Sequence, residues 1–260
     1  MFYRFILFLG MFLFVYKQLI AQIPIQTDRP DQTECPFIVP KGFLQFETGM
    51  SIEKITSNNI LYNHPSLLIK YGLSQQLELR IISELVSEKN LKGLSNGFVP
   101  ITVGFKVNIW QEKGAIPLTS FIGHLTFGAI ATPKFTSTYD APSFRFTMQH
   151  TLSKKISLGY NIGAEWDGET STPTYIYTFT SGFSLTEKLG SYIELYGFLP
   201  QKEKADQRAD AGLTYLLCND FMIDLSGGVG ITNNAPKKYM ALGFSFKVNT
   251  KRKGNKMEHR

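Results

Sequence analysis

Most of this chain alternates apolar and polar side chains with a period of two residues, the pattern of a β-strand whose two faces meet different surroundings. The clearest run is 43–55, where Leu44, Phe46, Met50 and Ile52 share one face and polar or small residues share the other. Twelve such segments follow one another without a convincing helix: 43–55, 66–71, 77–84, 101–109, 118–127, 144–152, 156–166, 175–185, 189–198, 210–217, 221–231 and 239–248. The chain is therefore predicted to be all-β.

The connections between these segments alternate in length. Short links follow the even-numbered strands, at 72–76, 110–117, 153–155, 186–188 and 218–220. Longer loops follow the odd-numbered strands, at 56–65, 85–100, 128–143, 167–174, 199–209 and 232–238. Short turns on one rim and longer loops on the other, with an even strand number, are typical of bacterial outer-membrane barrels. We therefore predict a transmembrane antiparallel β-barrel of about 12 strands in the outer membrane of a two-membrane bacterium.

Charged side chains sort to one face of almost every predicted strand. A closed barrel in lipid turns its apolar face outward, and this face holds residues such as Ile81, Phe105, Ile162, Leu225 and Phe244. The opposite face, toward the lumen, carries the charges: Glu47, Glu53, Lys70, Glu78, Arg80, Glu84, Lys106, Arg145, Glu165, Glu194, Asp210, Asp224 and Lys247. We expect Glu194 to face inward together with Tyr192 and Tyr196.

The first 21 residues have the features of a secretory signal peptide: a short basic start, a twelve-residue apolar run and Ala21 before a polar residue. A membrane-spanning helix needs about 20 apolar residues, and this run stops at Lys17. We expect cleavage after Ala21, then an extended segment at residues 22–42, the barrel at residues 43–248 and a basic periplasmic tail at residues 249–260.

The excess positive charge is confined to the two ends of the chain. The 260 residues include 27 Lys and Arg against 21 Asp and Glu, a net charge of +6. Two of these bases precede residue 22, and the last twelve residues hold five bases and one acid, which leaves 20 bases and 20 acids between them. A neutral body lacks the basic face that a phosphate backbone requires, so nucleic-acid binding is excluded.

The densest polar motif lies just before the first predicted strand. The segment Thr27–Glu34, with the sequence TDRPDQTE, holds three acids and one arginine in eight residues. One interpretation folds this segment into the lumen, where Arg29 pairs with inward carboxylates and narrows the path. The other leaves it as a solvated periplasmic lead-in, because charge runs are usually solvated. The sequence favours neither.

Several motifs resemble a family of outer-membrane transporters named for the meta pathway of phenol degradation. After TDRPDQTE come VPKG at 39–42, QFETG at 45–49, YGL at 71–73, LELR at 77–80, DLSGGVG at 224–230 and GFSF at 243–246. The resemblance covers nearly all of the mature chain. It implies a barrel that passes small molecules, aromatic or apolar ones among them, passively across the outer membrane. The expected partners are the lipid bilayer, a small-molecule solute and the outer-membrane assembly machinery.

No residue pattern points to an enzyme, a cofactor or a metal site. A pairing of His150 with Ser153 is the best start for a lipid-facing hydrolase, but no carboxylate has a predictable place beside it, and a lone His is weak evidence of catalysis. The sequence has no Gly-rich phosphate loop and no His-Glu-x-x-His motif. Cys35 and Cys218 lack metal-type spacing, and we expect two separate thiols.

We predict a narrow, charged path through the barrel, since twelve strands lie between small filled barrels and porins of about 16 strands. The residues expected to line or constrict it are Asp28, Arg29, Glu47, Glu78, Arg80, Lys106, Arg145, Glu165, Glu194 and Asp224. Both signs of charge are present, so no strong ion preference is predicted. Two alternatives stay open: a barrel with a structural or interaction role and no open path, and, less favoured, an outer-membrane hydrolase.

Overall fold

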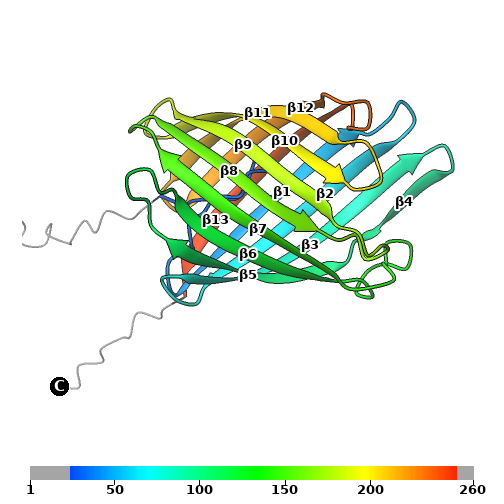
Figure 1. Ribbon diagram of the computed structural model, residues 1–260, viewed down its shortest axis with the longest axis horizontal. Coiled ribbons are helices and arrows are strands. Elements are labelled where there is room, and N and C mark those ends of the chain that lie inside the picture. The colour runs from blue at the N-terminus through cyan, green and yellow to red at the C-terminus, as the bar shows by residue number, and fades with distance from the viewer. Residues whose placement is uncertain (1–23, 251–260) are drawn as a thin grey trace, which may run out of the picture.

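The computed structural model of the protein describes residues 24–250, which form a closed antiparallel β-barrel (Figure 1). Its strands are β1 (Phe43–Lys54), β2 (Ile60–Gly72), β3 (Leu77–Asn90), β4 (Gly93–Phe98), β5 (Ile101–Trp110), β6 (Leu118–Phe127), β7 (Ala141–Thr151), β8 (Ile156–Glu165), β9 (Thr174–Ser184), β10 (Leu189–Pro200), β11 (Asp206–Cys218), β12 (Phe221–Gly230) and β13 (Lys238–Asn249). The expected signal peptide and residues 251–260 of the expected basic tail lie outside the described residues.

The barrel has twelve strand positions although thirteen strands are labelled. Neighbouring strands pair in sequence order around the wall, and β1 pairs with both β2 and β13, which closes it. Both β4 and β5 pair with β3: β5 pairs with its first half and β4 with its second half. The two strands, separated by Val99 and Pro100, therefore occupy one position in the wall. The predicted all-β, twelve-stranded architecture is confirmed.

The prediction of a loop at residues 85–100 is wrong. Residues 85–90 continue β3, and β4 folds back on them as a hairpin, with Leu85 opposite Phe98 and Asn90 opposite Gly93. The turn uses Gly93 at a φ of 128°, a conformation that favours glycine. Sequence alternation missed this hairpin because its outer part, Ser87 to Asn90, is polar on both faces.

The strands β2 and β11 also begin earlier than predicted, at Ile60 and Asp206 instead of residues 66 and 210. In β2 the pairing with both neighbours shifts register between Asn63 and Ser66, where Pro65 interrupts the strand. Proline has no N–H to donate to the ladder, so an irregularity at this place is expected. Both extensions lengthen the rim that carries the longer loops.

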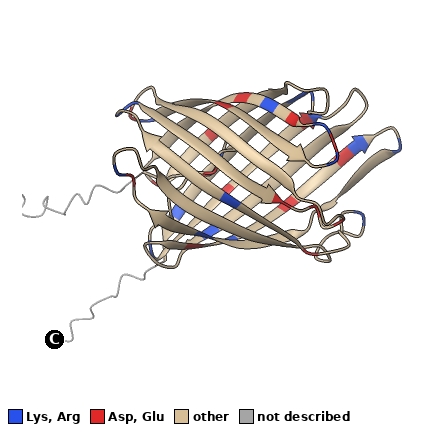
Figure 2. Cartoon of the chain, viewed as in Figure 1, with Lys and Arg blue, Asp and Glu red and all other residues tan. Residues whose placement is uncertain are grey.

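The two faces of the wall separate apolar from charged side chains as predicted. Outward residues at the middle of the strands remain exposed, for example Ile81 at 48%, Ile162 at 55% and Leu242 at 62%. Inward charges are buried, with Glu47, Lys70 and Lys106 all at 1% or less. In Figure 2 most of the wall is free of charge, and many charged positions lie in the loops at its two ends. An apolar outer band around a polar lumen is the arrangement that lipid requires.

No helix among residues 24–250 is long and apolar enough to cross a membrane.

A charge on the outer face should destabilise the barrel according to its depth in the bilayer. Leu225 and Val229 lie on the same face of β12, the first at mid-strand and the second near its outer end. We expect Leu225→Arg to lower the free energy of unfolding in lipid by about 2–4 kcal/mol and Val229→Arg by at most about 1 kcal/mol. Urea titrations of the two variants in vesicles measure the difference. An equal loss of unfolding free energy in the two variants would contradict the placement of Leu225 deeper in the membrane than Val229.

Candidate functional site: the charged lumen

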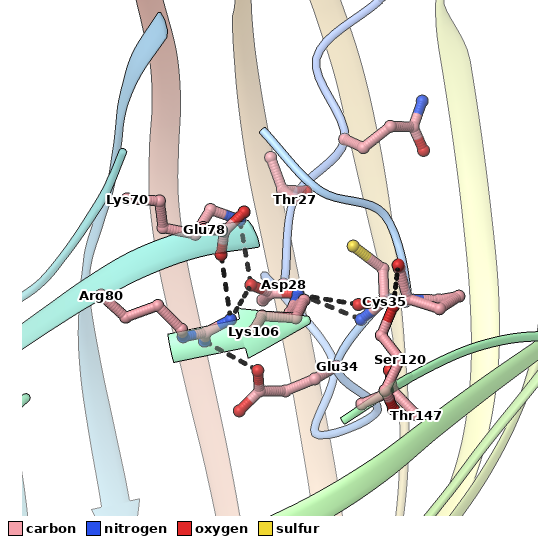
Figure 3. A network of polar contacts seen from close by, with 12 residues as sticks. Thr27, Asp28, Glu34, Cys35, Lys70, Glu78, Arg80, Lys106, Ser120 and Thr147 are labelled. Atoms are coloured by element: carbon pink, nitrogen blue, oxygen red, sulfur yellow. Dashed lines mark hydrogen bonds and ion pairs between the residues drawn. The ribbon is translucent and has the colours of Figure 1, made fainter. Parts of the chain in front are cut away.

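The segment before the first strand, residues 24–42, lies inside the barrel and contacts its inner wall. At one end the Ile25 N–H donates to the Asn219 carbonyl in the turn before β12. At the other end the Gly42 N–H donates to the Gly72 carbonyl at the end of β2. Between these points its polar groups bond to inward side chains of several strands, part of which Figure 3 shows. We call residues 24–42 the lumen segment.

Asp28 is the centre of the contacts between the lumen segment and the wall (Figure 3). Its carboxylate forms three ion pairs: with Lys70 Nζ of β2 at 2.9 Å, with Arg80 Nη1 of β3 at 3.0 Å and with Lys106 Nζ of β5 at 2.8 Å. All four side chains are at least 95% buried. One carboxylate from the segment thus neutralises part of a row of cations that three adjacent strands present.

Further acids complete the neutralisation of this row. Glu34 of the lumen segment pairs with Arg80 Nη2 at 2.7 Å, and Glu78 pairs with Arg80 Nη1 at 3.4 Å. Glu47 pairs with Lys70. The Lys106 ammonium also donates to the Cys35 carbonyl at 2.8 Å. Buried charges are tolerated where they are paired and hydrogen-bonded in this way.

Arg29 crosses to the other side of the segment and meets β12. Its Nη2 lies 2.9 Å from Asp224 Oδ1, and its Nε lies 3.3 Å from Asp224 Oδ2. The guanidinium occupies the space above Gly49 and Gly243, which face each other on β1 and β13. A Cβ at either glycine would lie 2.4 Å from Arg29 Nη2. These two glycines therefore leave room for the close approach of the arginine.

Inward side chains also accept the backbone N–H groups of the lumen segment. Glu47 Oε2 accepts from Asp28 N at 2.9 Å and Arg29 N at 3.1 Å, and Glu78 Oε2 accepts from Val39 N at 2.9 Å. The Glu194 carboxylate accepts from Gln32 N at 2.8 Å and Thr33 N at 2.7 Å. The Asn161 amide bonds to both the N–H and the carbonyl of Glu34, at 2.8 and 3.1 Å. An irregular backbone inside a barrel needs such partners because no neighbouring strand supplies them.

The structure brings eight of the ten predicted lumen residues into contacts of this kind. Arg145 has a smaller part, since its Nη1 donates to the Gln32 carbonyl at 3.1 Å. Glu165 lies apart, at the mouth formed by the longer loops. Sequence reasoning did not select Lys70, Glu34 or Asn161 for this site. Lys70 had the right signal, a charge on an inward position, but nothing in the sequence shows which inward charges meet the segment.

Two aspartates of the lumen segment have opposite electrostatic surroundings. Burial opposes ionisation of Asp28, but Lys106, Lys70 and Arg80 outweigh it and hold the pKa of its carboxyl well below the usual range. Burial raises the pKa of the Asp31 carboxyl well above the usual range, and the nearby acids Glu194 and Asp210 raise it further. Asp28 is therefore an anchoring anion, whereas Asp31 lies among like charges.

The barrel has a cavity toward each end, and the lumen segment lines only the one at the short turns. A cavity of about 320 Å³ lies at the rim of short turns, between the segment and the inner faces of β8 to β11, with Gly159, Gly182, Ser191 and Tyr192 in its lining. A second cavity of about 520 Å³ lies at the rim of longer loops, where Glu165, Phe198 and Arg208 line it. Along β10, Glu194 and Tyr196 are the inward residues between the two cavities.

A model of the family described as "Putative MetA-pathway of phenol degradation" matches residues 27–248. The chain belongs to this family. The match begins at Thr27, so the family region includes most of the lumen segment as well as nearly all of the barrel. No curated protein matches the chain in sequence.

Solved structures with the same fold as this family member are outer-membrane barrels. An outer membrane channel from Pseudomonas putida F1 has a TM-score of 0.64 at 12% identity, over 84% of this chain and 99% of that one. The NanC porin has a TM-score of 0.56 at 12% identity, over 79% and 100% of the two chains. The KdgM porin has a TM-score of 0.52 at 10% identity, over 78% and 98%. The predicted outer-membrane type of barrel is confirmed.

The residues weighed for a hydrolase have other contacts. His150 Nε2 lies 3.2 Å from the Tyr160 hydroxyl, and the Ser153 hydroxyl accepts from the backbone N–H groups of Lys155 and Ile156 in the turn. Cys35 and Cys218 are both free thiols, as expected, the first in the lumen segment and the second on the surface.

Loss of the Asp28 charge should release the lumen segment. Removing one partner of a buried ion pair costs about 3–5 kcal/mol, so Asp28→Asn should speed the modification of Cys35 by about a hundredfold or more. The measurement is labelling by a maleimide on a polymer too large for the cavities, in a Cys218→Ser background.

Asp31→Asn is the matched control, because Asp31 forms no ion pair among the described residues. It should leave the labelling rate of Cys35 unchanged or lower it. Equal acceleration in both variants would show that Asp28 does not hold the segment.

Proposed function

We propose that this protein is an outer-membrane channel whose own lumen segment restricts the passage of small molecules. The observation that carries the proposal is the one-sided anchoring of that segment. Asp28 and Glu34 bind it to β2, β3 and β5 through buried ion pairs. The side of the lumen near β8 to β11 keeps a cavity at each end. A closed barrel with a partly filled lumen suits selective passage better than bulk flow.

The path we propose runs along the inner faces of β8 to β11. A solute enters between the longer loops, at the cavity lined by Phe198 and Arg208. It then passes the inward residues Glu194 and Tyr196 and reaches the cavity at the short turns. Glycines at 159, 182 and 190 widen the cavity at the short turns because they have no side chain to fill it. Passage down a gradient requires no further chemistry from the protein.

We propose small aromatic or apolar molecules as the solute. The family description, which refers to phenol degradation, supports this class. The lining of the short-turn cavity supports it too, since Ile25, Leu216 and Met222 contribute apolar surface beside the glycines. Ligand cavities generally combine apolar lining with a few polar groups that orient the ligand. Insertion by the outer-membrane assembly machinery stays a prediction.

Single-channel recording in planar bilayers tests whether the barrel conducts. The wild type should show small discrete steps, and deletion of residues 24–40 should raise their size several-fold because it empties the lumen. Asp28→Asn should add larger, transient steps, since it releases the segment without removing it. Folding of each variant is checked by its heat-dependent migration in gels.

The outcome that contradicts a channel is a correctly folded barrel that does not conduct even after the deletion. That result would favour a barrel with a structural or interaction role.

Flux into vesicles tests the solute class. Proteoliposomes should take up phenol-sized aromatic molecules faster than neutral sugars of similar mass, relative to empty vesicles of the same lipid. Since such aromatics also cross bilayers unaided, the excess rate over empty vesicles is the quantity to compare. Equal excess rates for aromatics and sugars would contradict the proposed solute.

A further inference from the structure

Two carboxylates face each other on adjacent strands of the lumen wall. Glu194 of β10 lies directly opposite Asp210 of β11 in the strand register. Both point inward, with exposures of 3% and 7%. Like charges directly opposite on neighbouring strands destabilise a sheet. Asp31 of the lumen segment adds a third acid nearby, since the next residue, Gln32, donates its N–H to Glu194 at 2.8 Å.

Most basic side chains of the lumen form ion pairs elsewhere, and Arg145 of β7 donates to the Gln32 carbonyl. Lys70, Arg80 and Lys106 bind Asp28 on the other side of the segment, and Arg29 binds Asp224. Arg208, two residues before Asp210, pairs with Glu53 and Asp206 at 2.7 and 2.6 Å. Within residues 24–250, no Lys, Arg or His forms an ion pair with Asp31, Glu194 or Asp210. These three acids thus lie together without an ion-pair partner among the described residues.

Three buried oxygen atoms beside these acids lack hydrogen-bond partners. They are Asp210 Oδ1, the Tyr192 hydroxyl and the Ser226 hydroxyl, in residues that are all at least 93% buried. The large majority of buried polar atoms in proteins have a partner, so three such atoms in one region need an explanation. The other oxygen of Asp210, Oδ2, accepts from the Tyr239 hydroxyl.

The backbone leaves room for both tyrosine rings. Gly212 lies opposite both Tyr192 and Ser226 in the register, and a Cβ there would lie 2.5 Å from the Tyr192 ring. Gly228 lies opposite Asp210 and Tyr239, and a Cβ there would lie 2.5 Å from the Tyr239 ring. The Tyr239 ring therefore lies beside Asp210, and the Tyr192 ring lies beside Gly212, two residues further along β11. Asp31 and Tyr192 also line the cavity at the short turns, which connects this region to that end of the barrel.

We propose that this cluster, formed by Asp31, Tyr192, Glu194, Asp210 and Tyr239, binds a singly charged cation that enters from the short-turn cavity. The cation offsets the repulsion between the acids and contacts the unpartnered oxygens of Asp210 and Tyr192. A tightly chelated divalent metal fits less well, because no group of three His, Cys, Asp or Glu side chains within residues 24–250 is arranged to hold one. The site does not depend on conduction.

Stability in solutions of different cations tests the site directly. A ligand that binds only the folded state raises its stability in proportion to the logarithm of its concentration above Kd. We expect the thermal unfolding midpoint of the purified barrel in detergent to rise with potassium chloride, methylammonium chloride or both. The bulky cation N-methylglucamine keeps the ionic strength constant. The potassium and methylammonium titrations distinguish binding of an alkali ion from binding of an amine.

Asp210→Asn should weaken the apparent affinity about tenfold or more, as expected for a loss of ~1.4 kcal/mol or more. It should also raise the midpoint in the absence of the small cations, because it removes the repulsion. Tyr192→Phe keeps the ring and removes one oxygen, and should weaken binding to a smaller degree. Asp167→Asn, in the exposed loop between β8 and β9, is the control and should respond as the wild type does.

A thermal unfolding midpoint that rises with neither potassium nor methylammonium would overturn the proposal. The acids would then be held by a shared proton, and stability would instead rise as the pH falls. An equal response in the wild type and in Asp210→Asn, with Tyr192→Phe also unchanged, would place any bound cation elsewhere. Because the readout is stability, these results are separate from those of the conductance experiments.

Discussion

The lumen of this barrel depends on one buried carboxylate. Asp28 meets Lys70, Arg80 and Lys106, each within 3.0 Å, and these cations come from three adjacent strand positions. Without Asp28, Lys106 would have no ion-pair partner among the described residues, and Lys70 and Arg80 would each lose one of theirs. Buried charges with too few partners are costly. The charged wall and the lumen segment therefore stabilise each other. Its position follows from this complementarity of charge.

The anchoring divides the lumen into two unequal parts. On the side of β1 to β6, charges of opposite sign are paired and buried. On the side of β8 to β11, glycine and small polar residues line the wall, and cavities remain toward both ends. Glu194 links the two parts, since it accepts the backbone N–H groups of Gln32 and Thr33 while it lies opposite Asp210. The acids that carry no ion pair thus lie beside the open side of the lumen.

Much of the wall was predictable from the sequence, and some of the rim was not. The alternation of apolar and polar residues predicts the inward and outward faces, because every strand has lipid on its outer face and the charged lumen on its inner face. It fails at residues 85–100, where the hairpin of β3 and β4 extends past the apolar band and neither face is apolar over Ser87 to Asn90. The role of Thr27–Glu34 stayed open for a related reason. A charge run has the same composition whether its partners are water or side chains of a distant strand.

The sequence alone determined the barrel type, the even number of strands and the face on which each charge lies, because a period of two residues is a local property. Only the tertiary structure decided which charges meet. Asp28 and Lys106 are 78 residues apart, and Arg29 and Asp224 are 195 residues apart. Closure of the wall brings such positions within hydrogen-bond distance across the lumen. No local pattern carries that information, since it depends on the register of every strand pair around the barrel.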